Sequence, residues 1–168
     1  MNAMKDGLYD EVLIECLDSS TISTDCATIH SLELHTVSVP DLTFCAPYEI
    51  ANGSSTSCLI NAFVIWFDTY FTEGRSVKVD AKTRAETWKG KGNAFTTGPY
   101  CPPTHWKQVI CLIKGCPIKL DAQQKLKGTL SYSKGKESAR EIEIVITWSI
   151  AHDAIDTGQR SSQTYILR

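Results

Sequence analysis

The sequence has no long hydrophobic segment and little surplus charge of either sign. Its longest apolar run extends from Ala62 to Phe67, far too short for a bilayer span of about 20 residues. No apolar core of a secretory leader is found near Met1. The formal net charge of −2 over 168 residues gives no overall attraction to nucleic acid or to a membrane surface. We therefore expect one domain of ordinary size, located in the cytoplasm or the nucleus, with no membrane and no direct nucleic-acid partner.

The seven cysteines and four histidines lack the spacing of a disulfide framework or a metal site. The cysteine count is odd, no Cys-x-x-Cys pair occurs, and several cysteines lie within apolar runs. That usage is typical of free thiols in a reducing compartment. No two histidines have the spacing of helical metal ligands, and no cluster of carboxylates accompanies them. We expect seven free thiols and no metal ion.

Common catalytic and binding motifs are missing or incomplete. There is no Gly-x-Ser-x-Gly nucleophile elbow. Gly90-Lys-Gly92 lacks the third glycine and the Gly-Lys-Ser/Thr ending of a phosphate-binding loop. Cys101 lies four residues before His105, which leaves a Cys–His nucleophile as an alternative, although nothing marks the thiol as activated. Asn52-Gly53-Ser54 matches a glycosylation sequon, but Asn-Gly also favours a tight turn, and a turn is our prediction.

Alternation of apolar and polar side chains dominates the C-terminal third of the chain. Leu126, Leu130 and Tyr132 share one parity, and Ile142 to Ile150 repeat the alternation after the turn at Lys134-Gly-Lys136. A period of two is typical of strands with one buried face. The pattern predicts an antiparallel hairpin over residues 125–150.

The remaining elements are shorter. Apolar residues at i, i+4 spacing predict one short helix over residues 2–11. Residues 58–71 are apolar on both parities, which predicts a central strand or a long bent strand covered on both faces. Further strands are predicted over residues 12–17, 32–37, 42–50, 109–114 and 161–168, with a long exposed loop over 73–93. The expected class is all-β, an antiparallel β-barrel or sandwich-like barrel with a short N-terminal helix.

One stretch combines stiffness with side chains suited to recognition. Residues 95–108 contain three of the six prolines, which fix φ and favour extended conformations before them. We interpret the stretch as a stiff loop that presents His105 and Trp106, whose side chains should point in roughly opposite directions on an extended segment. An indole packs against cations, and an imidazole carries a proton or pairs with a carboxylate. The alternative is that Trp106 is a core residue and His105 a capped surface residue.

Two segments of this stretch resemble the Thr-His-Trp loop of the protein arginine N-methyltransferases, namely Phe95-Thr-Thr-Gly-Pro99 and Thr104-His-Trp-Lys-Gln108. The similarity continues outside the loop and spans roughly Ile29 to Arg168. It includes Leu34-His-Thr-Val37, Asp41-Leu-Thr-Phe44, the stretch Phe63–Phe71 and Ser162-Gln-Thr-Tyr165. In that family this region is the C-terminal β-barrel.

The resemblance implies a division of the chain and a role for three residues. Residues 1–17 resemble the end of the family's dimerisation arm and its return into the barrel, and residues 18–168 resemble the substrate-binding barrel. His105 is implied to be catalytic, by pairing with an acidic residue of the methyltransferase domain. Trp106 and Thr104 are implied to contact the substrate, with Trp106 forming a wall of the pocket for the substrate arginine.

The resemblance also sets expectations about cofactor and partners. The family uses S-adenosylmethionine as co-substrate, but its cofactor-binding glycine motif and its double-glutamate hairpin are absent from this sequence. We therefore expect a fragment that alone binds no cofactor and transfers no methyl group. The full-length enzyme is expected to form a homodimer and to act on arginine-containing proteins. The alternative is a non-catalytic β-barrel that serves as an interaction or regulatory subunit.

Overall fold

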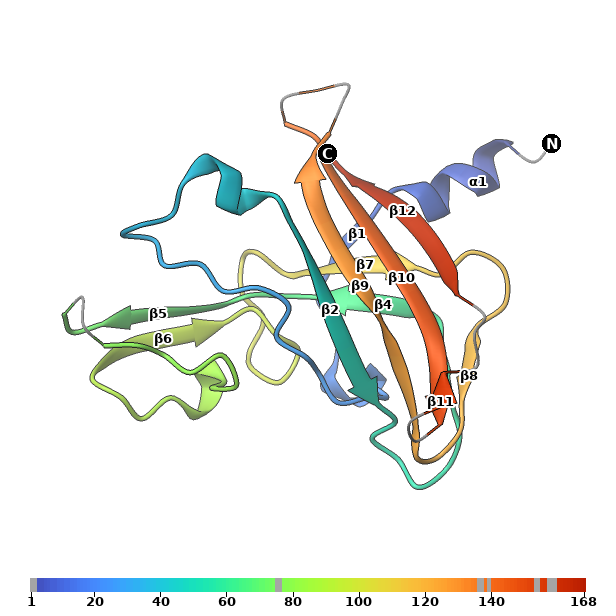
Figure 1. Ribbon diagram of the computed structural model, residues 1–168, viewed down its shortest axis with the longest axis horizontal. Helices are drawn as coiled ribbons and strands as arrows, with labels where there is room; N and C mark the ends of the chain where they lie inside the picture. Colours follow the sequence, from blue (N-terminus) through green and yellow to red (C-terminus); the bar gives the residue numbers. More distant parts are fainter. Residues whose placement is uncertain (1–2, 75–76, 136–137, 139, 153–154, 157–159) are drawn as a thin grey trace.

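The computed structural model describes residues 3–74, 77–135, 138, 140–152, 155–156 and 160–168. The described residues form one α-helix, three short 3₁₀ helices and twelve strands (Figure 1). In chain order these are α1 (Ala3–Asp10), β1 (Leu13–Glu15), η1 (Ser19–Thr21), η2 (Val39–Leu42), β2 (Phe44–Ala51), β3 (Cys58–Ile60), β4 (Ala62–Ile65), β5 (Asp68–Thr72), η3 (Ala85–Thr87), β6 (Gly92–Thr96), β7 (Gln108–Leu112), β8 (Ile118–Leu120), β9 (Gln124–Lys134), β10 (Ile142–His152), β11 (Ile155–Asp156) and β12 (Ser161–Leu167). The all-β class and the short N-terminal helix are confirmed.

The predicted hairpin forms the centre of the largest sheet. β9 and β10 pair antiparallel, with Leu130 opposite Ile146 and Tyr132 opposite Ile144. β2 adds to the free edge of β9, while β11 and β12 both pair with the other edge of β10. The described strands form four sheets, of five, three, two and two strands, which do not close into one continuous barrel.

The inner face of this sheet contains the main core. Its buried members come from four strands of the sheet and from β7: Tyr48, Cys111, Leu130, Ile144, Ile146 and Tyr165. The Tyr48 hydroxyl donates to the carbonyl of Thr147 at 2.9 Å, which satisfies its polar atom within the core. A second buried cluster, around Leu120 and Leu126, continues the core toward β3 and β8.

Residues 58–72 form a bent path, which is the second of the two arrangements predicted for this segment. The chain runs through β3, β4 and β5, which pair in turn with β8, β7 and β6. The first break falls at Asn61 and the second at Trp66 and Phe67. The two faces of this path are less completely covered than predicted, because the side chains of Phe67 and Phe71 are exposed. The path therefore connects three small sheets and ends in the β5–β6 hairpin, which projects away from the five-stranded sheet (Figure 1).

The strand predicted over residues 32–37 is wrong. The amides of Thr36 and Val37 both donate to the carbonyl of Glu33, at 3.0 and 2.8 Å, so the segment is a turn. Leu34 is 72% exposed. Alternation over six residues did not produce a strand here, since a strand also needs a partner with which to pair.

The predicted exposed loop over residues 73–93 is wrong in part. Its last two residues, Gly92 and Asn93, belong to β6, which the sequence analysis did not predict. The middle of the segment forms η3, and Ala85 within it is buried. A polar composition indicated solvent exposure, but side-chain contacts with β5 cover part of the segment.

Asn52 occupies a turn, as predicted. Its side-chain amide donates to the carbonyls of Thr56 and Leu120, at 2.8 and 3.0 Å, and its oxygen accepts from the amide of Ser54 at 2.8 Å. These three hydrogen bonds use the amide group fully within the protein and favour the turn over the sequon.

The structure adds three observations on cysteines, metals and membranes. All seven cysteines are free. Within the described residues, no group of three or more His, Cys, Asp or Glu side chains is arranged to hold a metal ion. None of the described helices has both the length and the apolar character that crossing a bilayer requires.

Candidate functional site

The Thr-His-Trp loop comprises residues 97–107. Two buried polar residues are hydrogen-bonded to each other at its base, where the two ends of the loop meet. Thr97 and Gln108 are 1% and 2% exposed. The side-chain amide of Gln108 donates to the carbonyl of Thr97, and its oxygen accepts from the amide of Leu17 at 2.7 Å. Thr97 in turn bonds Phe67 through its amide and its hydroxyl, at 3.0 and 3.1 Å. The two ends of the loop are therefore joined to each other, to Leu17 two residues after β1, and to Phe67 immediately before β5.

Beyond this base, the first part of the loop packs tightly against Trp66. The amide of Gly98 donates to the hydroxyl of Thr96 at 2.9 Å. A Cβ at Gly98 would lie 2.8 Å from the indole nitrogen of Trp66, too close for any other residue without rearrangement. Tyr100 contacts the same indole edge to face, with ring centroids 6.2 Å apart.

His105 and Trp106 occupy a turn. The amide of Lys107 donates to the carbonyl of Thr104 at 3.4 Å, and Lys107 has a φ of 57°. The extended conformation predicted for this pair is wrong, because the positive φ of Lys107 reverses the chain. Their rings lie edge to face, with centroids 6.2 Å apart. The ammonium of Lys107 pairs with Glu15 at 3.1 Å, which links the turn to β1.

Trp106 belongs to an exposed cluster of aromatic side chains, called here the aromatic face: Phe67, Phe71, Phe95 and Trp106. Trp106 stacks on Phe95 at 5.4 Å, and Phe95 stacks on Phe71 at 6.2 Å. Phe67 meets both Phe95 and Trp106 edge to face, at 6.0 and 6.1 Å. Trp106 is 57% exposed, Phe71 60% and Phe67 46%. The alternative that Trp106 is a core residue is wrong.

Contiguous exposed rings of this kind mark an interaction surface in soluble proteins. The register of the hairpin places Phe95 opposite Thr69 and Phe71 opposite Asn93, all on one side of β5 and β6. The other side presents Asp68 and Tyr70, which the segment around η3 covers. The hairpin is therefore covered on one side and bare on the aromatic side.

The structure brings the three predicted site residues together on one turn. Trp106 and His105 are exposed, whereas the Thr104 hydroxyl is buried and has no hydrogen-bond partner among the described residues. Nothing in the described part of the chain joins the Cys101 thiol to the His105 ring, so the Cys–His alternative gains no support.

The sequence analysis assigned no role at this site to five residues: Phe95, Thr97 and Gln108, which lie within the stretch 95–108, and Phe67 and Phe71, which lie outside it. Gln108 gave one signal, because this polar residue directly precedes the apolar run of a strand, Val109–Ile113. The aromatic residues gave none, since their exposure depends on how the hairpin is packed.

Known proteins resemble this chain in sequence and in fold. The family described as arginine methyltransferase oligomerization subdomain matches residues 1–153, and the chain belongs to this family. Ribosomal protein arginine N-methyltransferase rmt3 of Schizosaccharomyces pombe is 32% identical over 99% of this chain and 28% of its own length. Protein arginine N-methyltransferase 1 of Caenorhabditis elegans is 25% identical over 98% of the chain and 42% of its own length.

Two solved structures share the fold. The Trypanosoma brucei PRMT1 enzyme-prozyme heterotetrameric complex with AdoHcy has a TM-score of 0.77 at 23% identity and covers 95% of this chain and 44% of its own. Arabidopsis thaliana protein arginine methyltransferase 10, in an open conformation, has a TM-score of 0.80 at 20% identity, covering 98% of this chain and 45% of its own. The chain thus spans less than half the length of these relatives.

Proposed function

We propose that this chain is the barrel portion of a protein arginine N-methyltransferase, which transfers a methyl group from S-adenosylmethionine to an arginine guanidinium of a protein substrate. Membership of the arginine methyltransferase oligomerization family supports the proposal. The observation that carries it is the exposed His105–Trp106 turn, set on a buried hydrogen-bonded base beside two further exposed rings, Phe67 and Phe71, and the half-buried ring of Phe95.

Trp106 suits the orientation of a guanidinium. Its indole is exposed on one side and stacked on Phe95 at 5.4 Å on the other, so its plane is fixed before any substrate arrives. A flat cation packs favourably on an indole face. Fixing the guanidinium plane in line with a donor methyl contributes several kcal/mol to lowering the barrier, because reacting groups then need little further alignment. Thr104, in the same turn, is proposed to contact the substrate through its backbone, because its hydroxyl is buried.

His105 suits a contact with a carboxylate. Its ring is exposed beside Trp106, at the edge of the aromatic face. An imidazole that meets an acidic residue of a methyltransferase domain becomes more basic and ties the turn to that domain. We propose that the aromatic face forms the apolar part of the same contact, since burial of such rings stabilises an interface.

The methyl donor is assigned to no residue of this chain. Within the described residues, the α-helix α1 opens the chain, and no glycine-rich turn leads from a strand into a helix, the arrangement that binds dinucleotide-like cofactors. The residues present do not fit the donor, so no step of the transfer is derived through it. Donor binding is proposed for a separate methyltransferase domain.

Oligomerisation is supported by the family, and we propose a homodimer in which residues 1–17 contribute to the contact between subunits. The proposed location is the cytoplasm or the nucleus, with arginine-containing proteins as substrates.

A regulatory subunit is the second candidate function. One structural relative is an enzyme-prozyme heterotetrameric complex, which shows that this fold occurs in assemblies with such a partner. In that case the aromatic face of this chain would bind a catalytic partner, and the chain would carry no turnover of its own.

A matched set of full-length variants tests the proposal. We expect Trp106→Ala to reduce turnover of an arginine peptide at least about tenfold while leaving donor affinity unchanged, because only guanidinium alignment is lost. His105→Ala should reduce turnover and also lower the melting temperature, through loss of the contact between domains. Leu34→Ala, at an exposed site outside the aromatic face, is the control. Wild-type turnover in both variants would contradict the catalytic proposal, and full activity of a partner enzyme only in the presence of this chain would favour the regulatory one.

A further inference from the structure

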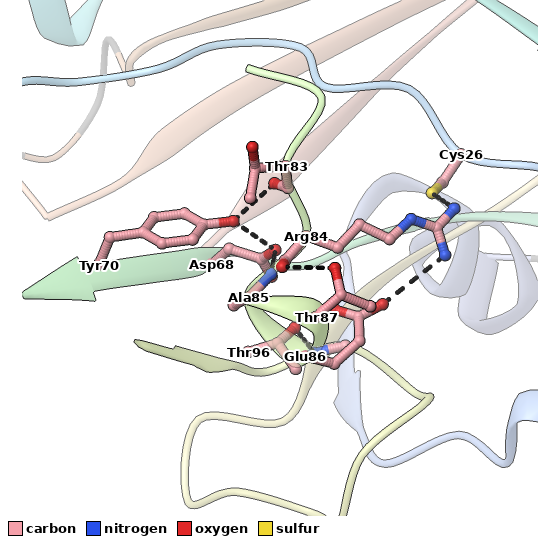
Figure 2. A network of polar contacts seen from close by, with 10 residues as sticks. Cys26, Asp68, Tyr70, Thr83, Arg84, Ala85, Glu86, Thr87 and Thr96 are labelled. Atoms are coloured by element: carbon pink, nitrogen blue, oxygen red, sulfur yellow. Dashed lines mark hydrogen bonds and ion pairs between the residues drawn. The ribbon is translucent and has the colours of Figure 1, made fainter. Parts of the chain in front are cut away.

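A segment of residues 77–91, called here the 77–91 loop, covers one side of the β5–β6 hairpin (Figures 1 and 2). The backbone amide of Ala85 donates to a carboxylate oxygen of Asp68 at 2.9 Å. The hydroxyl of Tyr70 donates to the carbonyl of Thr83 at 2.6 Å. Two consecutive inward side chains of β5 therefore bind the backbone of the loop, one on each side of Arg84.

Packing reinforces these hydrogen bonds. Ala85 is buried, and the ring of Trp88 meets the ring of Tyr70 edge to face at 5.3 Å. The Trp88 indole lies so close beneath Gly90 that a Cβ at that position would be 2.1 Å from a ring carbon. Residues 83–88 of the loop are thus attached to β5 through Ala85, Thr83 and Trp88, while most other side chains of the loop are exposed.

Arg84 extends from this loop to two other segments. One guanidinium nitrogen donates to the thiol sulfur of Cys26 at 2.8 Å, and the other lies 3.7 Å from a carboxylate oxygen of Glu86 (Figure 2). The guanidinium carbon lies 5.7 Å from the centre of the Tyr100 ring, a cation–π distance. A planar guanidinium is suited to contacts with several segments at once.

The segment that carries Cys26 is also attached to the loop. The hydroxyl of Thr28 donates to the carbonyl of Ala81 at 2.6 Å. Arg84 is therefore held from both directions, by its own loop and by residues 26–28. The Arg84 guanidinium that contacts the Tyr100 ring is thus already held by other segments.

Tyr100 belongs to the Thr-His-Trp loop, four residues before Thr104. Its ring contacts both the Arg84 guanidinium and the Trp66 indole. The base of the Thr-His-Trp loop is fixed at Thr97 and Gln108. Contact with Arg84 adds a second fixed point, on the proline-rich side of the His105–Trp106 turn.

We propose that Arg84 is a positioning residue for the Thr-His-Trp loop: through its contact with Tyr100, it restricts the motion of residues 98–107 and so keeps Trp106 in place for the substrate guanidinium. This inference rests on the proposed function for its catalytic consequence, but not for its structural one. Arg84 acts through Tyr100 and touches neither substrate nor donor. The 77–91 loop thereby gains a role in the site, although it lies on the side of the hairpin away from the aromatic face.

The test uses the full-length protein with four variants: Arg84→Ala, Arg84→Lys, Tyr100→Leu, and the double variant Arg84→Ala/Tyr100→Leu. Lys89→Ala is the control, because it removes an exposed cation from the same loop. Amide hydrogen exchange is measured for residues 98–107 and, as a reference, for the β9–β10 pair. Turnover of an arginine peptide is measured in parallel.

We expect Arg84→Ala to accelerate exchange of residues 98–107 about tenfold without change in β9 and β10. kcat should fall by several-fold while the KM for the methyl donor is unchanged. Arg84→Lys should restore part of both effects, because it retains a cation over the ring. The double variant should be no worse than Tyr100→Leu alone, since both changes remove one contact.

Three results would overturn the inference. Exchange of residues 98–107 in Arg84→Ala equal to that in Lys89→Ala would show that no restriction passes through Arg84. Additive effects in the double variant would show that the two side chains act independently. Faster exchange throughout β9 and β10 in Tyr100→Leu and both Arg84 variants would show that Arg84 stabilises the protein as a whole and does not act on residues 98–107 in particular. If the wild-type protein transfers no methyl group, the proposed function fails, while the exchange data still decide the positioning role.

Discussion

Gln108 and Thr97 are eleven residues apart and nearly inaccessible to solvent, and the side-chain amide of Gln108 donates to the Thr97 carbonyl. The same side chain accepts from the amide of Leu17 at 2.7 Å. One glutamine thus satisfies two backbone groups from two distant segments. The base of the loop that carries the His105–Trp106 turn is therefore held together by this single side chain.

Replacement of Gln108 by Ala should therefore be costly. One buried and one partly buried backbone group lose their partner, at about 1–3 kcal/mol each, so we expect the free energy of unfolding to fall by about 2–6 kcal/mol. Chemical denaturation monitored by tryptophan fluorescence measures the change. Gln124→Ala is the control, because within the described residues the Gln124 side chain bonds only the nearby amide of Asp121, at 2.8 Å. Equal effects of the two substitutions would contradict the assignment.

The two buried tyrosines of the main core should respond differently to removal of the hydroxyl. The Tyr48 hydroxyl donates to the carbonyl of Thr147, whereas the buried Tyr165 hydroxyl has no partner among the described residues. Tyr48→Phe should lower the free energy of unfolding by about 1 kcal/mol. Tyr165→Phe should leave it unchanged or raise it, because a desolvated hydroxyl is removed. Paired urea titrations decide this, and a larger loss in Tyr165→Phe would show that its hydroxyl is satisfied after all.

Thiol reactivity should separate the cysteines by burial. Cys16, Cys45 and Cys116 are exposed and should react first with a disulfide reagent at pH 8. Burial raises the pKa of the Cys111 thiol to about 12, so this residue should react only after unfolding. Denatured, unreduced protein should show seven thiols, and a lower count would reveal a disulfide and overturn the expected reducing compartment.

The same shift makes a prediction about alkaline stability. The folded protein holds the Cys111 proton up to a pKa of about 12, while the unfolded chain releases it near pH 9. Deprotonation therefore favours the unfolded state. The stabilisation is fully present below pH 9 and is lost progressively between about pH 9 and 12. Cys111→Ala should weaken this dependence, as melting curves recorded across that range would show; an unchanged slope would indicate that other groups dominate it.

The aromatic face should bind hydrophobic dyes in the 168-residue chain. Phe71, the most exposed of the four rings, stacks on Phe95. Phe71→Ser should reduce the fluorescence of a bound naphthalene sulfonate dye by about half, because it removes the most exposed ring of the apolar surface. Leu34→Ser alters an exposed apolar side chain elsewhere and should have little effect. Equal reductions would show that the dye reports general exposure and not this surface.

The central hairpin could be predicted from the sequence because its information is local. Alternation over β9 and β10 defines both the buried face and the register, and the observed pairing of Leu130 with Ile146 follows from it. The same local pattern at residues 32–37 gave a wrong prediction. There the segment pairs with none of the described strands, and the backbone amides of Thr36 and Val37 close a turn on Glu33 instead.

Only the part of the site that its amino-acid composition marks could be predicted from the sequence. Prolines and the His105–Trp106 pair marked the loop, and family resemblance gave these residues a role. The reversal at Lys107 was not predictable, because lysine rarely adopts a positive φ. Nor was the contact of Arg84 with Tyr100, which depends on a segment whose polar composition is typical of a solvated loop.

The hydrogen bond between Leu17 and Gln108 spans 91 positions, and the ion pair between Glu15 and Lys107 spans 92. On a ribosome that adds about 5–20 residues per second, β1 emerges roughly 5–20 seconds before β7, the strand with which it pairs. During that interval the first strand has neither its edge partner nor the buried acceptor for Leu17. The base of the loop that presents His105 and Trp106 therefore cannot close until Gln108 has been synthesised, and residues 13–17 have no contact with β7 before that point.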